Sequence, residues 1–172
     1  MTMQYDVKHA QLNSSGYRVK YSVRVKGISF TGGASAGYVV LFDTSSTPVS
    51  SSVTYAQSGT TVTVTKTAHG LVTGDIIGIH FASNSGVSAT DGTYSITRVD
   101  ANSFTLTDIN SRTITSTAAI YVSGVNRWLM TYETHSTDEF QNSPLIPGEG
   151  VLVANGIYAY MNAIDSAQIY YG

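Results

Sequence analysis

The chain contains no cysteine, so disulfide bonds and metal sites built on thiolates are excluded. The redox character of its compartment therefore cannot be inferred. No run approaches the roughly 18 apolar residues of a membrane-spanning helix, so a membrane is not expected as a partner. No apolar stretch follows a basic N-terminal start, so a signal peptide is not expected either.

Charge is also scarce. Only 12% of the 172 residues are charged, and 9 Lys and Arg stand against 11 Asp and Glu, which gives a net charge of −2. Nucleic-acid binding is not expected of a chain without excess positive charge, because phosphate contacts dominate that affinity. Such weak surface charge is typical of a subunit embedded in an assembly. The 42% hydrophobic content is too high for a disordered chain.

The most regular pattern covers residues 17–26, where odd positions are apolar and even positions are polar or cationic. Side chains of a strand alternate between its faces, so this pattern predicts one strand with a dry face and a basic face. The basic face is a candidate interface for an acidic partner, and the alternative is a solvated sheet surface. Its cations are Arg18, Lys20, Arg24 and Lys26.

The remaining chain is typical of short strands separated by Gly, Ser and Asn turns, and no helical periodicity is found. Residues 44–52 are rich in Ser and Thr and are interpreted as a linker. We therefore predict an all-β fold in which an outer β-sandwich or jelly-roll-like domain, residues 1–50 plus 118–172, carries a small β-barrel inserted at residues 51–117. The predicted strands cover residues 5–12, 17–30, 38–43, 60–65, 75–81, 94–99, 104–107, 120–122, 128–132, 151–153, 157–161 and 168–171.

One motif has the pattern of a catalytic serine. Residues 33–37 match G-x-S-x-G, which in hydrolases exposes a serine at a strained turn from strand to helix. Here a strand follows the motif, so Ser35 is not expected to be a nucleophile. A small hydrolase is thereby excluded as a third class of function.

The histidines do not have the spacing of a metal site. His69 and His80 could approach Asp75 across a hairpin, but a turn histidine and a strand histidine are the simpler interpretation. Residues 100–102 resemble the start of a calcium loop whose later ligands are missing. We expect no enzyme activity, no cofactor and no bound metal.

Tyrosine is abundant, with 12 residues, and several lie close to residue 172. Adjacent Tyr170 and Tyr171 must point to opposite faces of a strand, so one of them is predicted to be outward or interfacial. Tyrosine is enriched at protein interfaces, which makes both residues interface candidates. The alternative is that they are half-buried residues of a sheet.

Three segments resemble a small β-module that recurs in virion proteins of tailed phages. They are residues 69–75 (HGLVTGD), 91–94 (DGTY) and 99–106 (VDANSFTL), and the resemblance covers residues 53–110. The module is named after the FCCH-like β-domain of ubiquitin-activating enzymes, and no enzymatic residues accompany it. Its glycines Gly70, Gly74 and Gly92 are expected in hairpin turns that need positive φ.

The flanking regions resemble a family of short virion structural proteins of marine phages and cyanophages, whose typical members have no insert. The resemblance implies a virion component, most simply a capsid decoration (cement) protein on the outer shell, or alternatively a neck, tail or fibre component whose insert serves adhesion or spacing. The implied partners are the major capsid protein or neighbouring virion subunits, with a homo-oligomer, a trimer by preference. The motifs that carry it are residues 24–28 (RVKGI), 35–37 (SAG), 145–152 (LIPGEGVL), 156–158 (GIY) and 169–172 (IYYG).

Overall fold

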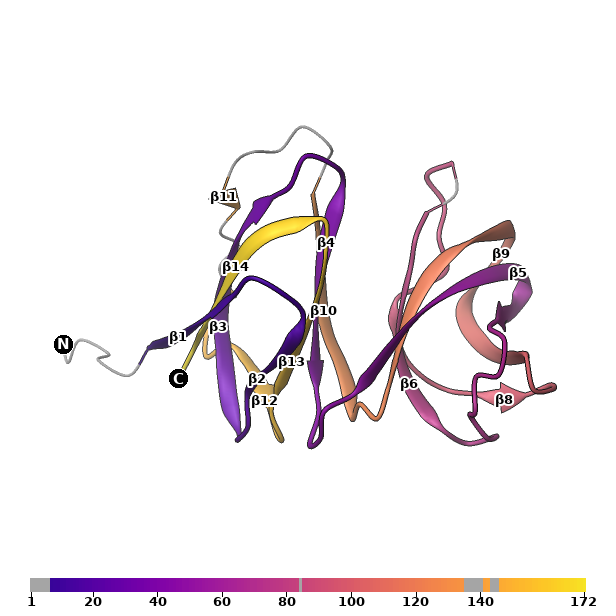
Figure 1. Ribbon diagram of the computed structural model, residues 1–172, viewed down its shortest axis with the longest axis horizontal. Helices are drawn as coiled ribbons and strands as arrows, with labels where there is room; N and C mark the ends of the chain where they lie inside the picture. The colour runs from indigo at the N-terminus through magenta and orange to yellow at the C-terminus, as the bar shows by residue number, and fades with distance from the viewer. Residues whose placement is uncertain (1–6, 84, 135–140, 143–145) are drawn as a thin grey trace. The chain divides into compact units, whose positions relative to one another are not determined.

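The computed structural model describes residues 7–83, 85–134, 141–142 and 146–172. Every regular element in these ranges is a β-strand, and the paired strands run antiparallel, so the fold is all-β as the sequence predicts. The chain forms two compact units (Figure 1). Unit 1 consists of Met1–Thr47 and Leu129–Gly172, and unit 2 of Pro48–Trp128.

Unit 1 is built from two sheets, which have the order β1-β14-β3-β11, with β12 also on β3, and β10-β4-β13-β2. The strands of the first sheet are β1 (Lys8–Leu12), β3 (Val23–Gly32), β11 (Gln141–Asn142), β12 (Val151–Val153) and β14 (Ile164–Tyr171). Those of the second are β2 (Gly16–Val19), β4 (Gly37–Asp43), β10 (Arg127–Thr134) and β13 (Ile157–Asn162).

The two sheets share one hydrophobic core, so unit 1 is a β-sandwich. Ile28 and Ile169 reach this core from the first sheet, and Leu41 and Ile157 reach it from the second. All four are at most 1% exposed. The core positions of β3 change from odd to even along the strand, because Val23 and Val25 lie before its irregular position at Lys26 and Ile28 and Phe30 lie after it.

Unit 2 contains β5 (Val49–Thr65), β6 (Ile76–Phe81), β7 (Gly92–Ser95), β8 (Thr97–Arg98) and β9 (Ser103–Ser123). The long strands β5 and β9 pair along almost their whole length (Figure 1). The end of β9 also pairs with β6, β6 pairs with β7, and β8, one residue after β7, pairs with the start of β9. The path from β9 through β6, β7 and β8 therefore leads back to β9. The closed strands form a small barrel around a second hydrophobic core.

The boundaries of the insert differ from the predicted ones. Residues 49–52 are the first part of β5 rather than a linker, and residues 120–122 belong to β9 rather than to the outer domain. Ser50 pairs with Val122 and Ser52 with Ile120. The Ser-rich segment is therefore a strand because it pairs with a segment that is distant in sequence. Unit 2 therefore extends beyond residues 51–117 at both ends.

The prediction of one continuous strand over residues 17–26 is wrong. The chain leaves the second sheet after Val19 and enters the first sheet at Val23, with Lys20 to Ser22 as the crossing. Val19 and Val23 are both buried, because Val19 lies on the inner face of the second sheet and Val23 on the inner face of the first. Tyr21, expected on the dry face, is 52% exposed. The four cations therefore do not share one side of one sheet.

The turn glycines agree with the prediction at two positions of three. Gly70 has φ 70° and Gly74 has φ 97° in the turn before β6. Gly92 does not have positive φ; it is the first residue of β7 and pairs with Ile79. The expected tight turn at Asp91 and Gly92 is therefore wrong, because Asp91 instead binds the neighbouring strand β6 through its side chain, where its Oδ1 accepts from Phe81 N.

Candidate interaction surface

Arg24 and Lys26 lie at the start of β3, where the turn after residue 146 packs against them. The Arg24 guanidinium donates to Gly150 O at 3.3 Å and lies 3.8 Å from the Glu149 carboxylate. Lys26 Nζ donates to Glu149 O at 2.8 Å. The ion pair is exposed, with side chains 41% and 84% accessible, so it contributes only about 0–1 kcal/mol. Both cations remain able to attract a further carboxylate.

The close fit of this turn depends on Gly150. Its φ is 82°, and a Cβ at this position would collide with Val25 O. β12 begins directly after the turn and pairs with β3, with Val151 opposite Val25. The β3 ladder with β14 is irregular here, because Tyr170 lies opposite Gly27 and Tyr171 opposite Val25, which leaves Lys26 as a bulge residue.

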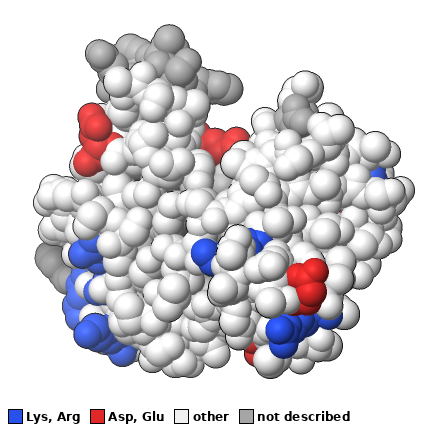
Figure 2. Space-filling model, turned by 45° about the vertical axis from the view of Figure 1, so that its right-hand side comes forward, with Lys and Arg blue, Asp and Glu red and all other residues white. Residues whose placement is uncertain are grey.

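The other two predicted cations lie elsewhere. Arg18 is on β2, and its Nη2 donates to Ser14 O at 2.6 Å. Lys20 lies in the crossing between the sheets, with Nζ 5.7 Å from the centroid of the Tyr17 ring. The structure thus brings Lys20, Arg24 and Lys26 to the region where β3 begins, and it directs Arg18 back toward the β1–β2 turn. Figure 2 shows Lys and Arg side chains gathered at the lower left of the molecule.

Tyr170 and Tyr171 point to opposite faces of β14, as predicted. Tyr170 lies on the outer face of the first sheet, where its hydroxyl is 3.3 Å from Ser29 Oγ and donates to Gln168 Oε1 at 3.0 Å. Tyr171 packs against the sandwich core. Burial raises the pKa of Tyr171, and the Tyr21 hydroxyl beside it raises this pKa further. Both tyrosines are half-buried, and Tyr170 is the one on the outer face because Tyr171 packs on the core.

The histidines do not form the grouping that the sequence left open. His80 Nδ1 lies 2.6 Å from Asp91 Oδ2, whereas the His69 ring contacts Asp100 O and accepts from Leu71 N. Asp75 instead accepts from Val72 N in the turn before β6. Within the described part of the chain, no three His, Asp or Glu residues are arranged to hold a metal ion.

Ser35 lies exposed in the loop between β3 and β4, which is a strand-to-strand connection. The two glycines of the motif have a packing role, because a Cβ on Gly33 would lie 2.8 Å from Ala163 O and one on Gly37 would collide with the same atom. No helix N-terminus follows the serine, so the strained elbow that activates such a nucleophile is not formed.

Two buried carboxylates are not indicated by the sequence pattern. Asp43 is 3% exposed and accepts hydrogen bonds from Ala154 N, Asn155 N, Asn155 Nδ2 and Gly156 N. Burial acts to raise its pKa, but these donors together hold the pKa below its usual value. The only signal in the sequence is an aspartate at the end of a buried strand. Its partners follow 111 or more residues later, so their proximity cannot be inferred.

Asp108 is the second buried carboxylate, and it lies in unit 2. It is 1% exposed and accepts from Thr90 N and Asn110 N at 3.0 Å and from Arg112 Nη1 at 2.7 Å. Burial would raise its pKa, but the hydrogen bonds and the Arg112 charge lower it. Nearby, burial and the charges of Asp108 and Asp91 raise the pKa of Tyr94 to about 12. These contacts fix the loop before β7 to β9.

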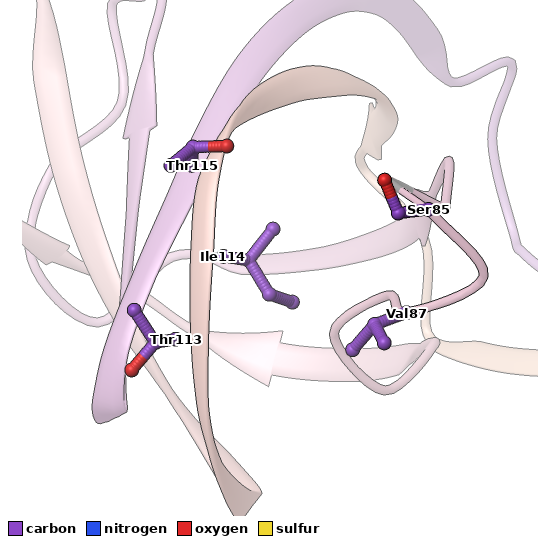
Figure 3. A pocket seen from close by; sticks show the side chains of 5 residues that line it. All are labelled: Ser85, Val87, Thr113, Ile114 and Thr115. Carbon is purple, nitrogen blue, oxygen red and sulfur yellow. The ribbon is translucent and has the colours of Figure 1, made fainter.

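One groove of unit 2 lies between the loop after β6 and the middle of β9 (Figure 3). Its volume is about 300 Å³. Ile114 and Val87 are its apolar walls, and hydroxyl groups complete the lining. The lining residues are Ser85, Val87, Thr113, Ile114 and Thr115. It holds no titratable side chain, so acid or base catalysis has no group here.

Comparison with protein-family models finds no matching family, and comparison with curated proteins finds no matching sequence. Within the described residues there is also no helix of the length and hydropathy that crossing a membrane requires.

Proposed function

We propose that the chain is a structural protein of a tailed-phage virion, and specifically a capsid decoration protein bound to the outer shell. The proposal rests on the sequence resemblance. Unit 1 is the shell-binding part, and unit 2 is an inserted module. The partners are the major capsid protein and neighbouring copies of the chain.

One structural observation supports the proposal more than any other. The flanking motifs that carry the resemblance are far apart in sequence, yet three of them lie side by side in the first sheet of unit 1. Val151 and Leu152 pair with Val25 and Arg24, and Gly172 exchanges two main-chain hydrogen bonds with Arg24. Motifs that pair within one sheet are expected of a family whose members share that sheet.

The module motifs are also placed in a way that favours a structural role. Residues 69–75 form a turn of the barrel, and residues 99–106 form a second turn and the start of β9. Lys66 N, before the first turn, and His69 N donate to the main chain of Asn102 and Ala101 and so join the two turns. These residues therefore have a structural part in the barrel. An insert that serves as a spacer or adhesion module needs such a stable frame and no catalytic group.

The test is the copy number of the chain in purified virions, measured by quantitative mass spectrometry against the major capsid protein. A decoration protein is present in hundreds of copies, because it follows the symmetry of the shell. About a dozen copies or fewer would instead identify a neck, tail or fibre component. Absence from intact particles would overturn the proposal that the chain is a virion protein.

A further inference from the structure

Most of the exposed charged side chains in the described part of unit 1 are separated by sign along the strand direction; Arg18, which donates to Ser14 O, lies outside both groups. Lys8 lies opposite Tyr171, and Tyr171 lies opposite Val25, so Lys8 shares a row of the first sheet with the start of β3. Arg24 and Lys26 flank that row, and Lys20 precedes it in the crossing from β2. We call this the basic end; its residues are Lys8, Lys20, Arg24 and Lys26.

Acidic side chains occupy the other end of the same sandwich. Asp165 is a bulge residue between Ile164, opposite Gly32, and Ser166, opposite Thr31. Glu133 precedes Thr134, whose hydroxyl accepts from Gly37 N. A Cβ on Gly37 would collide with Ala163 O, two residues before Asp165, so both acids lie at this end. We call Glu133 and Asp165 the acidic end, and both are exposed.

The two ends are well separated. β3 runs from Val25 in the basic row to Gly32 beside Asp165, and seven residues of strand span about 20 Å. That distance exceeds the Debye length of about 8 Å at physiological ionic strength, so the ends do not neutralise each other in solution. Glu149 offsets only part of the basic end, since its 3.8 Å contact with Arg24 is exposed.

We propose that the basic end of unit 1 binds the acidic end of a second copy of this chain. Contacts of like ends bring charges of the same sign together, whereas a head-to-tail contact pairs opposite charges. Such a contact is heterologous, and it either closes into a ring, as in a cyclic trimer, or continues as a filament. The occupant is a second copy because the same sandwich presents both complementary surfaces. This proposal does not depend on the virion function.

The test is sedimentation velocity of the full chain over a range of protein concentrations, at about 10 mM and about 0.5 M salt. Two exposed charges are reversed at each end. The basic-end variant is Lys8→Glu with Lys20→Glu, and the acidic-end variant is Glu133→Lys with Asp165→Lys. A control, Lys66→Glu with Arg98→Glu, changes net charge as much as the basic-end variant does but lies in unit 2.

The wild-type mass is expected to rise with protein concentration at low salt and to return to the monomer at high salt, because screening shortens the attraction. Each end variant alone should stay monomeric, and an equimolar mixture of the two should associate again, since it restores opposite charges at the contact. The control should associate as the wild type does. Circular dichroism checks the fold, and the milder Lys8→Gln with Lys20→Gln replaces the basic-end variant if that variant is unfolded.

Several results would overturn the proposal. A wild-type mass that is independent of salt and concentration would do so, as would wild-type association of either end variant. Failure of the mixture to associate, or equal loss of association in the unit 2 control, would show that the ends do not recognise each other.

Discussion

Asp43 joins the end of β4 to the segment between β12 and β13, and its environment has a consequence for stability. The carboxylate is buried and accepts four hydrogen bonds, three of them from main-chain N–H groups. Its pKa in the folded chain is below the usual 3.8. The folded state therefore binds fewer protons than the unfolded state, so this stabilisation is complete above about pH 4 and is lost as the pH falls through the folded pKa.

Asp43→Asn should remove this dependence. The amide group carries no charge and turns a donor toward other donors, so unit 1 should lose about 1–3 kcal/mol at pH 7. Below pH 4 the difference between variant and wild type should shrink. Urea denaturation at a series of pH values, followed by the amide NMR signals of β13, measures both effects. The exposed Asp165→Asn is the control, and equal loss of stability at every pH would contradict the assignment.

Two glycines of unit 2 give a matched test of backbone strain. Gly74 has φ 97°, whereas Gly92 has no positive φ and an added Cβ would meet only Tyr94 at 3.4 Å. Gly74→Ala should therefore destabilise unit 2 by about 1–3 kcal/mol, and Gly92→Ala by less than about 1 kcal/mol. The measurement is the urea midpoint of each variant. A larger effect at Gly92 would restore the turn that the sequence suggested there.

At the scale of elements, β3 is the strand that organises the first sheet, since β14, β11 and β12 all pair with it. The turn at residues 147–150 delivers β12 to β3, and its two glycines differ in their surroundings. Gly148 has φ 70° and open space, whereas Gly150 has φ 82° and presses on Val25 O. Substitutions at these two glycines therefore distinguish the effect of backbone strain from the effect of a steric collision.

Both Gly148→Ala and Gly150→Ala introduce strain from positive φ, but only Gly150→Ala adds a collision. Gly150→Ala should release β12, so the amides of residues 151–153 should exchange hydrogen much faster than in the wild type. Gly148→Ala should leave that exchange close to the wild-type rate. Equal exchange in both variants would mean that β12 does not depend on the contact between Gly150 and β3.

The sequence predicts the elements better than their connections. The positions of β3, β4, β6, β10 and β13 follow from alternation and turn residues. The crossing from Val19 to Val23 does not, because three residues separate them, and this odd number lets the odd–even pattern continue unchanged into the opposite sheet. Similarly, alternation identifies Arg24 as a polar strand residue, but its partner Gly150 follows 126 residues later. Long-range register was therefore the part that a single sequence could not give.

For the whole molecule, the central feature is that two β-units each have a complete core in one chain. Unit 2 begins and ends in adjacent strands, since Val49 pairs with Ser123. Paired Cα atoms of antiparallel strands are about 5 Å apart, so a few residues can close the gap that removal of the unit would leave. The predicted limits at 51 and 117 would leave short remnants of β5 and β9 without the rest of the barrel, whereas these limits do not.

The most direct measurement is the unfolding of a chain in which residues 49–126 are replaced by a short Gly/Ser linker. Unit 1 keeps the 13 buried core residues of its described part in this chain, so it should remain soluble, melt cooperatively and retain the amide NMR signals of β3, β4, β13 and β14. The full chain should show the same transition together with that of unit 2. An insoluble or non-cooperatively melting product would contradict the two-core account, and so would loss of the β3 and β14 signals.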